Sequence, residues 1–189
     1  MNPVKIHPHL LHRESALLML IDMQEPFLRH IHEREALIKN TRILIQGMNT
    51  LRVPIISTTQ YSQEMGDILP EVKEFLTSIA SPFDKMEFSC YRSQAVVSEI
   101  QRSGRKQILL AGVETHICVS QTAHDLTAAG YQVHVLSDAV SSRQEPNWRV
   151  GLDKMRQGGV LLSSVELALY EMLQDASTPE FKEILKVVK

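Results

Sequence analysis

Apolar and polar positions along the chain follow two periods, one typical of strands and one typical of helices. Short apolar runs bounded by turn residues predict strands at 16–21, 54–59, 107–112, 132–137 and 160–164. Apolar residues spaced three and four apart predict helices at 34–51, 68–79, 93–103, 116–129, 146–157 and 165–174. Because strands and helices alternate, the pattern predicts an α/β fold in which helices cover both faces of a parallel sheet.

The last residues carry a separate helical pattern at about 178–188. Ser177 and Thr178 precede it as capping residues, and Pro179 lies near its first turn. Its apolar stripe consists of Phe181, Ile184, Leu185 and Val188. The stripe fits two interpretations, packing on its own domain or forming an interface with another copy of the chain, and both stay open at this point.

Length and composition narrow the class of protein. A chain of 189 residues predicts a single domain spanning 1–189. The formal net charge of −2, with no block of Lys or Arg, indicates neither nucleic acid nor a membrane surface as a partner. The apolar run 16–21 is far too short to cross a bilayer, and the N-terminal residues lack a signal-peptide pattern. Two cysteines make no disulfide framework, so we expect a reduced, cytoplasmic setting.

Cys118 occupies the most informative position, where a predicted strand is followed by a helix. The apolar run before it ends at Gly112, Thr115 is a candidate N-cap, and Gly130 is a candidate glycine after the helix. In the first turn of a helix, backbone N–H groups and the helix dipole favour a thiolate, the nucleophilic form of cysteine. The position therefore indicates covalent catalysis. The alternative is a small buried side chain that packs a helix on the sheet.

The residues around Cys118 resemble the cysteine motif of the isochorismatase-like hydrolase superfamily, and further motifs match in order. They are Val113-Glu-Thr-His-Ile-Cys118-Val, the pattern D-x-Q-x-x-F at Asp22, Gln24 and Phe27, Lys85-Met-Glu-Phe88-Ser89-Cys-Tyr91, and the fifth-strand ending at 133–143. The resemblance covers nearly the whole chain and is greatest to the small, metal-free members of the family. It implies a three-layer sandwich with a six-stranded, Rossmann-like parallel sheet, in which the segment 81–91 holds a short strand carrying Lys85.

The resemblance also implies a catalytic triad of Asp22, Lys85 and Cys118 and a homo-oligomer. In an open parallel sheet the carboxyl ends of the strands meet at one edge, so the three side chains can share one crevice. Cys118 would attack an electrophilic carbon, Asp22 would act as base and then acid, and Lys85 would hold a positive charge beside both. Without the family match, Asp22 could be a helix N-cap and Lys85 a solvated surface charge.

Further roles follow from the same resemblance. The family carries a cis peptide before its cysteine, which corresponds here to Val113–Glu114. It places the N–H groups of Glu114 and Cys118 as an oxyanion hole. Four side chains are expected to contact the substrate, namely Gln24, Phe27, Gln60 and Phe88.

No cofactor or metal is expected. The nicotinamidase branch of the family carries an Asp-x-His after its second strand, whereas this chain has Thr58-Thr-Gln60-Tyr61-Ser62. None of the eight histidines lies in a strong metal-ligand motif, and no Gly-rich phosphate loop follows the first strand. Cys90, which could border the pocket or simply pack, forms no C-x-x-C pair.

The resemblance therefore predicts a cysteine hydrolase of a small molecule, cleaving an amide or ureido C–N bond. A non-catalytic binding or protein-interaction module on the same fold is the alternative, although all three catalytic residue types are present. A thiol-based redox sensor is a weaker interpretation, because such a sensor needs a resolving cysteine and Cys90 is the only candidate. The sequence does not name the substrate.

Overall fold

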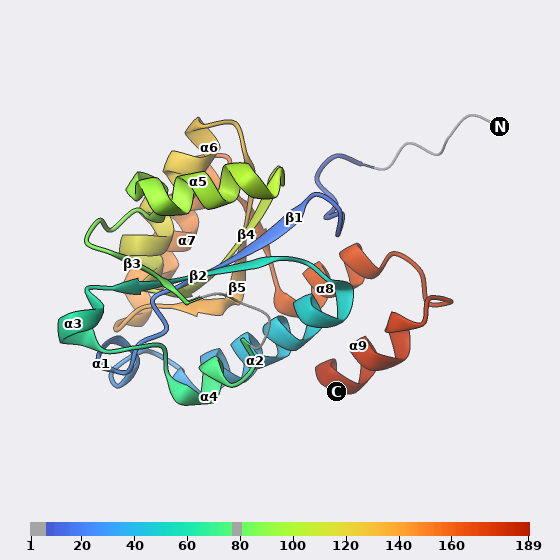
Figure 1. Cartoon of the computed structure of the whole chain (residues 1–189), viewed down its shortest axis with the longest axis horizontal. Coiled ribbons are helices and arrows are strands. Elements are labelled where there is room, and N and C mark those ends of the chain that lie inside the picture. The colour runs from blue at the N-terminus through green and yellow to red at the C-terminus, as the bar shows by residue number, and fades with distance from the viewer. Residues whose placement is uncertain (1–6, 77–80) are drawn as a thin grey trace.

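Six strands form one parallel sheet in the computed structural model, which describes residues 7–76 and 81–189. The strands are β1 (Ala16–Ile21), β2 (Ile55–Gln60), β3 (Phe83–Lys85), β4 (Gln107–Val113), β5 (Gln132–Ser141) and β6 (Leu161–Ser163). Their order is β3-β2-β1-β4-β5-β6, and each neighbouring pair runs parallel. The chain winds outward from β1 to β3 and then crosses back to β4, so the winding reverses between β1 and β4 (Figure 1).

Helices cover both faces of this sheet, which confirms the predicted three-layer α/β sandwich. One face carries α2 (Arg34–Leu51), α4 (Pro70–Lys73), α8 (Val165–Leu173) and α9 (Glu180–Val188). The other carries α5 (Gln94–Ser103), α6 (Ser120–Ala128) and α7 (Glu145–Gln157). Successive residues of β1 point to opposite faces, since Leu18 belongs to the first core cluster and Met19 to the second. Because both of its faces are buried, the sequence of β1 is a continuous apolar run.

Short turns of helix lie between these elements. They are α1 (Glu25–Leu28), α3 (Ser62–Met65), the 3-10 turn η1 (Cys90–Arg92) and the π-helical turn η2 (Thr115–Val119). The short strand expected within 81–91 is confirmed as β3, and it ends at Lys85. The sequence pattern did not predict α1 or α3, because a single turn is too short to show a period.

Two predicted helices differ from the structure. The helix expected at 68–79 is only α4, since the N–H groups of Phe75 and Leu76 bond three residues back and tighten the chain into turns; its last residues, 77–79, lie outside the described residues. The helix expected at 116–129 is divided into η2 and α6. Thr115 is not an N-cap, because Glu114 precedes the first turn and the Thr115 hydroxyl is buried without a partner among the described residues.

The C-terminal helix uses its apolar stripe inside the chain. Ile184 on α9 is fully buried, and Phe181 and Val188 pack against the same core cluster, which α2 and α8 also line. The structure therefore favours packing on its own domain over an interface for this stripe. No helix within residues 7–76 and 81–189 has the length and apolar character needed to cross a membrane.

A close contact between β1 and β4 sets the edge at which the site forms. Gly112 has φ +111°, and a Cβ atom there would lie 2.0 Å from the backbone oxygen of Ile21. Only glycine fits this approach. Beyond it β5 bulges, because Leu110 pairs with Val135 while Gly112 already pairs with Val140. The carboxyl ends of β1 and β4 thus lie together where the winding reverses, which is the usual position of a binding crevice.

Candidate active site

Asp22 and Lys85 meet at this edge as a buried ion pair. Asp22 follows β1 in the left-handed backbone region, at φ 50°, and Lys85 ends β3. Lys85 Nζ donates to Asp22 Oδ2 at 2.7 Å, and the two side chains are 0% and 2% exposed. Charges this deeply buried need a partner. The alternatives of a surface lysine and of a helix-capping Asp22 do not fit this geometry, because α1 begins after Gln24 with no side-chain cap.

Gln60 completes the surroundings of the lysine. Lys85 Nζ donates to Gln60 Oε1 at 2.6 Å, and Gln60 Nε2 donates to the backbone oxygen of Met86 at 2.8 Å. Burial lowers the pKa of Lys85, but the charges of Cys90, Asp22 and Cys118 outweigh it, and its pKa lies above the usual value. Burial raises the pKa of the neighbouring Cys90 thiol to about 11.

Thr58 holds the other oxygen of Asp22, a contact that the sequence analysis missed. Thr58 Oγ1 donates to Asp22 Oδ1 at 2.7 Å, while the Asp22 N–H donates to the Thr58 oxygen at 3.3 Å. Strand periodicity was the available signal, since Thr58 and Gln60 lie two residues apart on β2 and share a face.

Cys118 lies in η2 at the end of β4, with 8% of its surface exposed. Burial, and next the neighbouring Asp22 carboxylate, raise the pKa of the Cys118 thiol to about 12, although Lys85 lowers it. The helix start and Lys85 favour a thiolate, as the sequence indicates, but burial and the Asp22 carboxylate outweigh them. The structure places the Cys118 thiol beside the Asp22 carboxyl group.

A small cavity of about 70 Å³ opens onto the thiol. It is lined by Asp22, Phe27, Gln60, Phe88, Val113, Glu114, Ile117 and Cys118. Three of the four residues expected to bind substrate, Phe27, Gln60 and Phe88, thus lie around it, and Phe88 is 55% exposed. Larger grooves elsewhere, such as one of about 380 Å³ beside Trp148, contain none of the three triad residues.

Gln24 does not reach this cavity. It is fully buried, and its amide donates to the backbone oxygens of Gln60 and Gly66 at 3.1 and 2.7 Å. Its Oε1 accepts the N–H of Gln60 at 2.7 Å. The structure therefore gives Gln24 a scaffolding position that joins the end of β2 to the loop after β1, in place of the expected contact with substrate.

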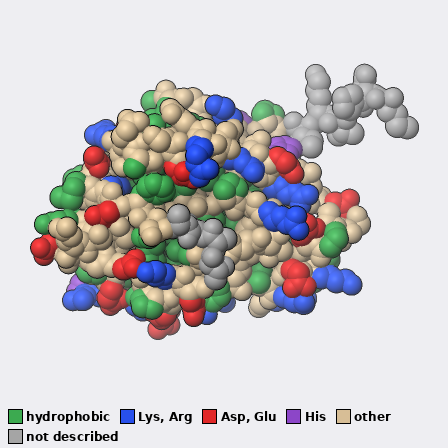
Figure 2. Space-filling model, viewed as in Figure 1, with side chains coloured by type: hydrophobic (Ala, Val, Ile, Leu, Met, Phe, Trp, Pro, Cys, Tyr) green, Lys and Arg blue, Asp and Glu red, His purple; other side chains and the backbone are tan. Residues whose placement is uncertain are grey.

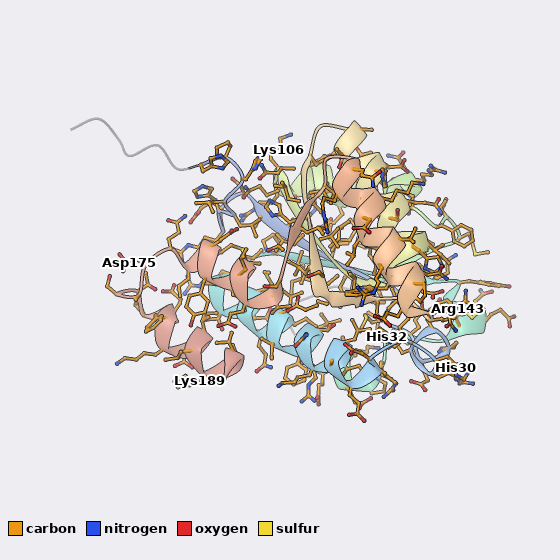
Figure 3. All side chains as sticks on the ribbon, turned by 180° about the vertical axis from the view of Figure 1, so that it is seen from behind. His30, His32, Lys106, Arg143, Asp175 and Lys189 are labelled. Carbon is orange, nitrogen blue, oxygen red and sulfur yellow. The ribbon has the colours of Figure 1, made fainter. Side chains whose placement is uncertain are left out.

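Glu114 forms the opposite wall. The Val113–Glu114 peptide is cis, as the resemblance implies. The Glu114 carboxylate accepts the backbone N–H of Arg143 at 2.9 Å and its Nε at 3.1 Å. Arg143 follows β5, and Figure 3 shows it at the same end of the molecule as His32, far from Lys106. This ion pair ties the loop after β5 to the cavity.

The side chains that could ligate a metal do not cluster within the described residues. Within residues 7–76 and 81–189, no group of three His, Cys, Asp or Glu side chains lies close enough to hold a metal ion. His116 bonds the Ser142 hydroxyl at 2.9 Å, and His124 bonds the Ser120 carbonyl at 2.6 Å. Both histidines of this segment thus have protein partners.

Comparison with known proteins places this geometry in a family. The profile of the isochorismatase domain matches residues 15–166. The secreted isochorismatase effector Isc1 of Phytophthora sojae is 38% identical over 183 residues, which cover 93% of this chain and 85% of that protein.

Among solved structures, the MAR1 ribonuclease from Caenorhabditis elegans is 31% identical with a TM-score of 0.89, covering 95% of this chain and 92% of that one. The Escherichia coli YcaC protein, described as an octameric hydrolase of unknown specificity, shares the fold at 22% identity and a TM-score of 0.85, covering 98% of both chains. The chain belongs to the isochorismatase family of hydrolases.

Proposed function

We propose that this protein is a cysteine hydrolase that cleaves an amide or ureido C–N bond of a small molecule. The observation that carries the proposal is the buried Asp22–Lys85 pair at a cavity that also exposes Cys118. A nucleophile, a base and a fixed positive charge are the groups that acyl transfer through cysteine requires.

The first half of the reaction forms a covalent intermediate. Asp22 takes the proton of the Cys118 thiol, and the sulfur attacks the carbonyl carbon. The oxyanion that forms accepts hydrogen bonds from the backbone N–H groups of Glu114 and Cys118. When the C–N bond breaks, Asp22 returns the proton to the departing nitrogen, which leaves as an amine or ammonia.

The second half releases the product. Asp22 takes a proton from a water molecule, whose oxygen attacks the thioester or thiocarbamate carbonyl. The C–S bond breaks, and the sulfur recovers the proton from Asp22, so the resting thiol is restored. Lys85 keeps its charge throughout and balances the carboxylate, in agreement with its raised pKa.

The cavity supports a small substrate. Its volume of about 70 Å³ is small beside the other grooves, and Phe27, Phe88, Val113 and Ile117 make its walls largely apolar. One relative is named a ribonuclease, but the net charge here is −2, and in Figure 2 acidic side chains lie among the basic ones on the face shown. Both features favour a small molecule over RNA.

Further expectations belong to the same proposal. We propose one domain over 1–189, in keeping with the profile match to residues 15–166. A homo-oligomer is supported by the octameric description of YcaC. The proposed cytoplasmic localisation rests on the low cysteine content, whereas one relative is named as secreted.

A substrate screen tests the proposal. Primary amides, ureido compounds and a single-stranded RNA would be incubated with the wild type, Cys118→Ala and the control Thr59→Val, whose hydroxyl bonds Asp84 and not the triad. We expect hydrolysis of an amide or ureido compound by the wild type and the control, and none by Cys118→Ala. Binding of a compound without turnover would favour the binding module. Turnover that survives Cys118→Ala would refute the nucleophile, and cleavage of RNA alone would refute the substrate class.

A further inference from the structure

Thr58 is fully buried, and its hydroxyl joins two groups of the site. It donates to Asp22 Oδ1 at 2.7 Å and lies 3.8 Å from Cys90 Sγ. Cys90 in turn is held by its backbone N–H, which donates to Thr122 Oγ1 at 2.9 Å. The proposed reaction gives Thr58 and Cys90 no chemical step, so their arrangement around the base calls for its own explanation.

The direction of this chain of hydrogen bonds follows from counting protons. A hydroxyl has one proton, and an ionised carboxylate can only accept, so the Thr58 proton points at Asp22. The contact with sulfur can then form only if the Cys90 thiol donates to Thr58 Oγ1. This requires a protonated Cys90, which agrees with a side chain that is 0% exposed and with burial raising its pKa to about 11.

We propose that Thr58 is a positioning residue of the active site, whose hydroxyl, oriented by the Cys90 thiol, holds the Asp22 carboxylate in place and favours its charged form. The inference rests on the proposed function, in which Asp22 is the base. Lys85 bonds Oδ2 and Thr58 bonds Oδ1, so each oxygen has its own donor and the carboxylate plane cannot turn freely. A hydrogen bond to the charged form of an acid stabilises that form.

Several titratable or charged groups surround Asp22. Lys85 faces it from β3, Cys118 from η2, and Cys90 reaches it through Thr58 from η1. Glu114, in the cavity wall, is paired with Arg143. The thiols and the lysine titrate above neutral pH, since the pKa values of Cys118, Cys90 and Lys85 are all raised. A change at Thr58 is therefore expected to alter the acidic limb of the pH dependence, where the carboxyl groups titrate, and not its alkaline limb.

The matched control lies next to Thr58 in the chain. Thr59 is 1% exposed and its hydroxyl also bonds a carboxylate, donating to Asp84 at 3.0 Å, but it points to the other face of β2. Thr59→Val therefore removes a hydroxyl of the same kind and burial without touching Asp22. Thr58→Ser keeps the donor, while Thr58→Val removes it at nearly constant volume.

The first measurement needs no substrate. In a Cys118→Ala background, the carboxyl carbon of Asp22 is titrated by ¹³C NMR, its signal assigned by its loss in Asp22→Asn. We expect Thr58→Val to move the midpoint upward by about one pH unit or more, as for loss of a hydrogen bond to a charged group. Thr58→Ser and Thr59→Val should leave it in place, and Cys90→Ala should move it upward by less than Thr58→Val.

The second measurement is the pH profile of kcat/KM on any substrate found, where Thr58→Val should move the acidic limb in the same direction. If Thr58→Val lowers only the melting temperature and leaves the Asp22 midpoint where it was, Thr58 is merely structural and the inference is wrong. An equal shift in Thr59→Val would also overturn it. A shifted midpoint in a protein that hydrolyses nothing would support the inference while the proposed function fails, so the two failures are distinguishable.

Discussion

Removing Lys85 should reveal what the buried ion pair does for the fold and for the site. Lys85→Met leaves the Asp22 side chain 2% exposed and without its cation, while Thr58 still donates to it. Breaking a buried pair from one side typically costs about 3–5 kcal/mol, because the remaining charge is desolvated without compensation. We expect a loss of that size in the free energy of unfolding at pH 7.

Replacing both partners should cost less than replacing one. In Asp22→Asn/Lys85→Met no charge is left unpaired, so most of the loss should be recovered, with a coupling of about 2 kcal/mol or more. The loss in Lys85→Met should also shrink at acidic pH, where the lone carboxylate can take up a proton. Activity should be absent from Asp22→Asn and from the double variant, which lack the base, and strongly reduced in Lys85→Met, which lacks the positive charge.

The assay is urea unfolding followed by circular dichroism at pH 7 and pH 4.5, with m-values compared. Lys73→Met is the matched control, because Lys73 and Asp67 form a surface pair with 54% and 52% exposed side chains. That variant should cost less than about 1 kcal/mol. Additive losses in the double variant, or a cost for Lys85→Met no larger than that for Lys73→Met, would refute the picture of a coupled, desolvated pair.

Four further predictions follow from the geometry. Iodoacetamide at neutral pH should modify Cys118 before Cys90, because Cys118 is 8% exposed on a cavity and Cys90 is 0% exposed; peptide mapping that finds the reverse order would contradict this. Gly112→Ala should lower the free energy of unfolding by about 3 kcal/mol or more, since its Cβ would lie 2.0 Å from a backbone oxygen of β1; unchanged urea unfolding would contradict the close approach. Burial lowers the pKa of His134 to about 4 from 6.5, so the unfolded chain binds this proton first and stability should fall by about 3 kcal/mol between pH 6.5 and pH 4; His134→Gln should remove that part of the pH dependence in urea titrations. Chelator treatment should leave turnover unchanged and elemental analysis should find no stoichiometric metal; chelator-sensitive activity with bound zinc would overturn the metal-free prediction.

Continuous burial made part of the fold easy to predict. The strand 16–21 and the helix 34–51 have the bounds observed for β1 and α2, because an all-apolar run and a long 3.6-residue period each admit one interpretation. The strand predicted at 132–137 extends to Ser141, because the bulge opposite β4 lets polar residues continue the strand. A pattern based on alternation does not show such a bulge.

The candidate site was predictable only where topology alone decides position. Asp22 and Cys118 follow β1 and β4 and Lys85 ends β3, so once the family resemblance supplies β3, their meeting at the carboxyl edge needs no side-chain detail. Gln24 shows where such a prediction fails. It belongs to the same D-x-Q-x-x-F motif as Asp22, but its amide is hydrogen-bonded to backbone groups and does not reach the cavity. Thr58 shows the converse, because its bond to Asp22 depends on which face of the sheet its side chain lies on.

The thiol itself shows why the balance of opposing effects requires a structure. A helix start and Lys85 favour a thiolate, whereas burial and Asp22 oppose it, and the sequence contains no measure of burial. With the pKa of Cys118 raised to about 12, the proposed reaction requires the thiol to lose its proton to Asp22 as the sulfur attacks. In the proposed reaction, the Asp22 carboxylate that opposes the thiolate at rest is therefore also the base that forms it.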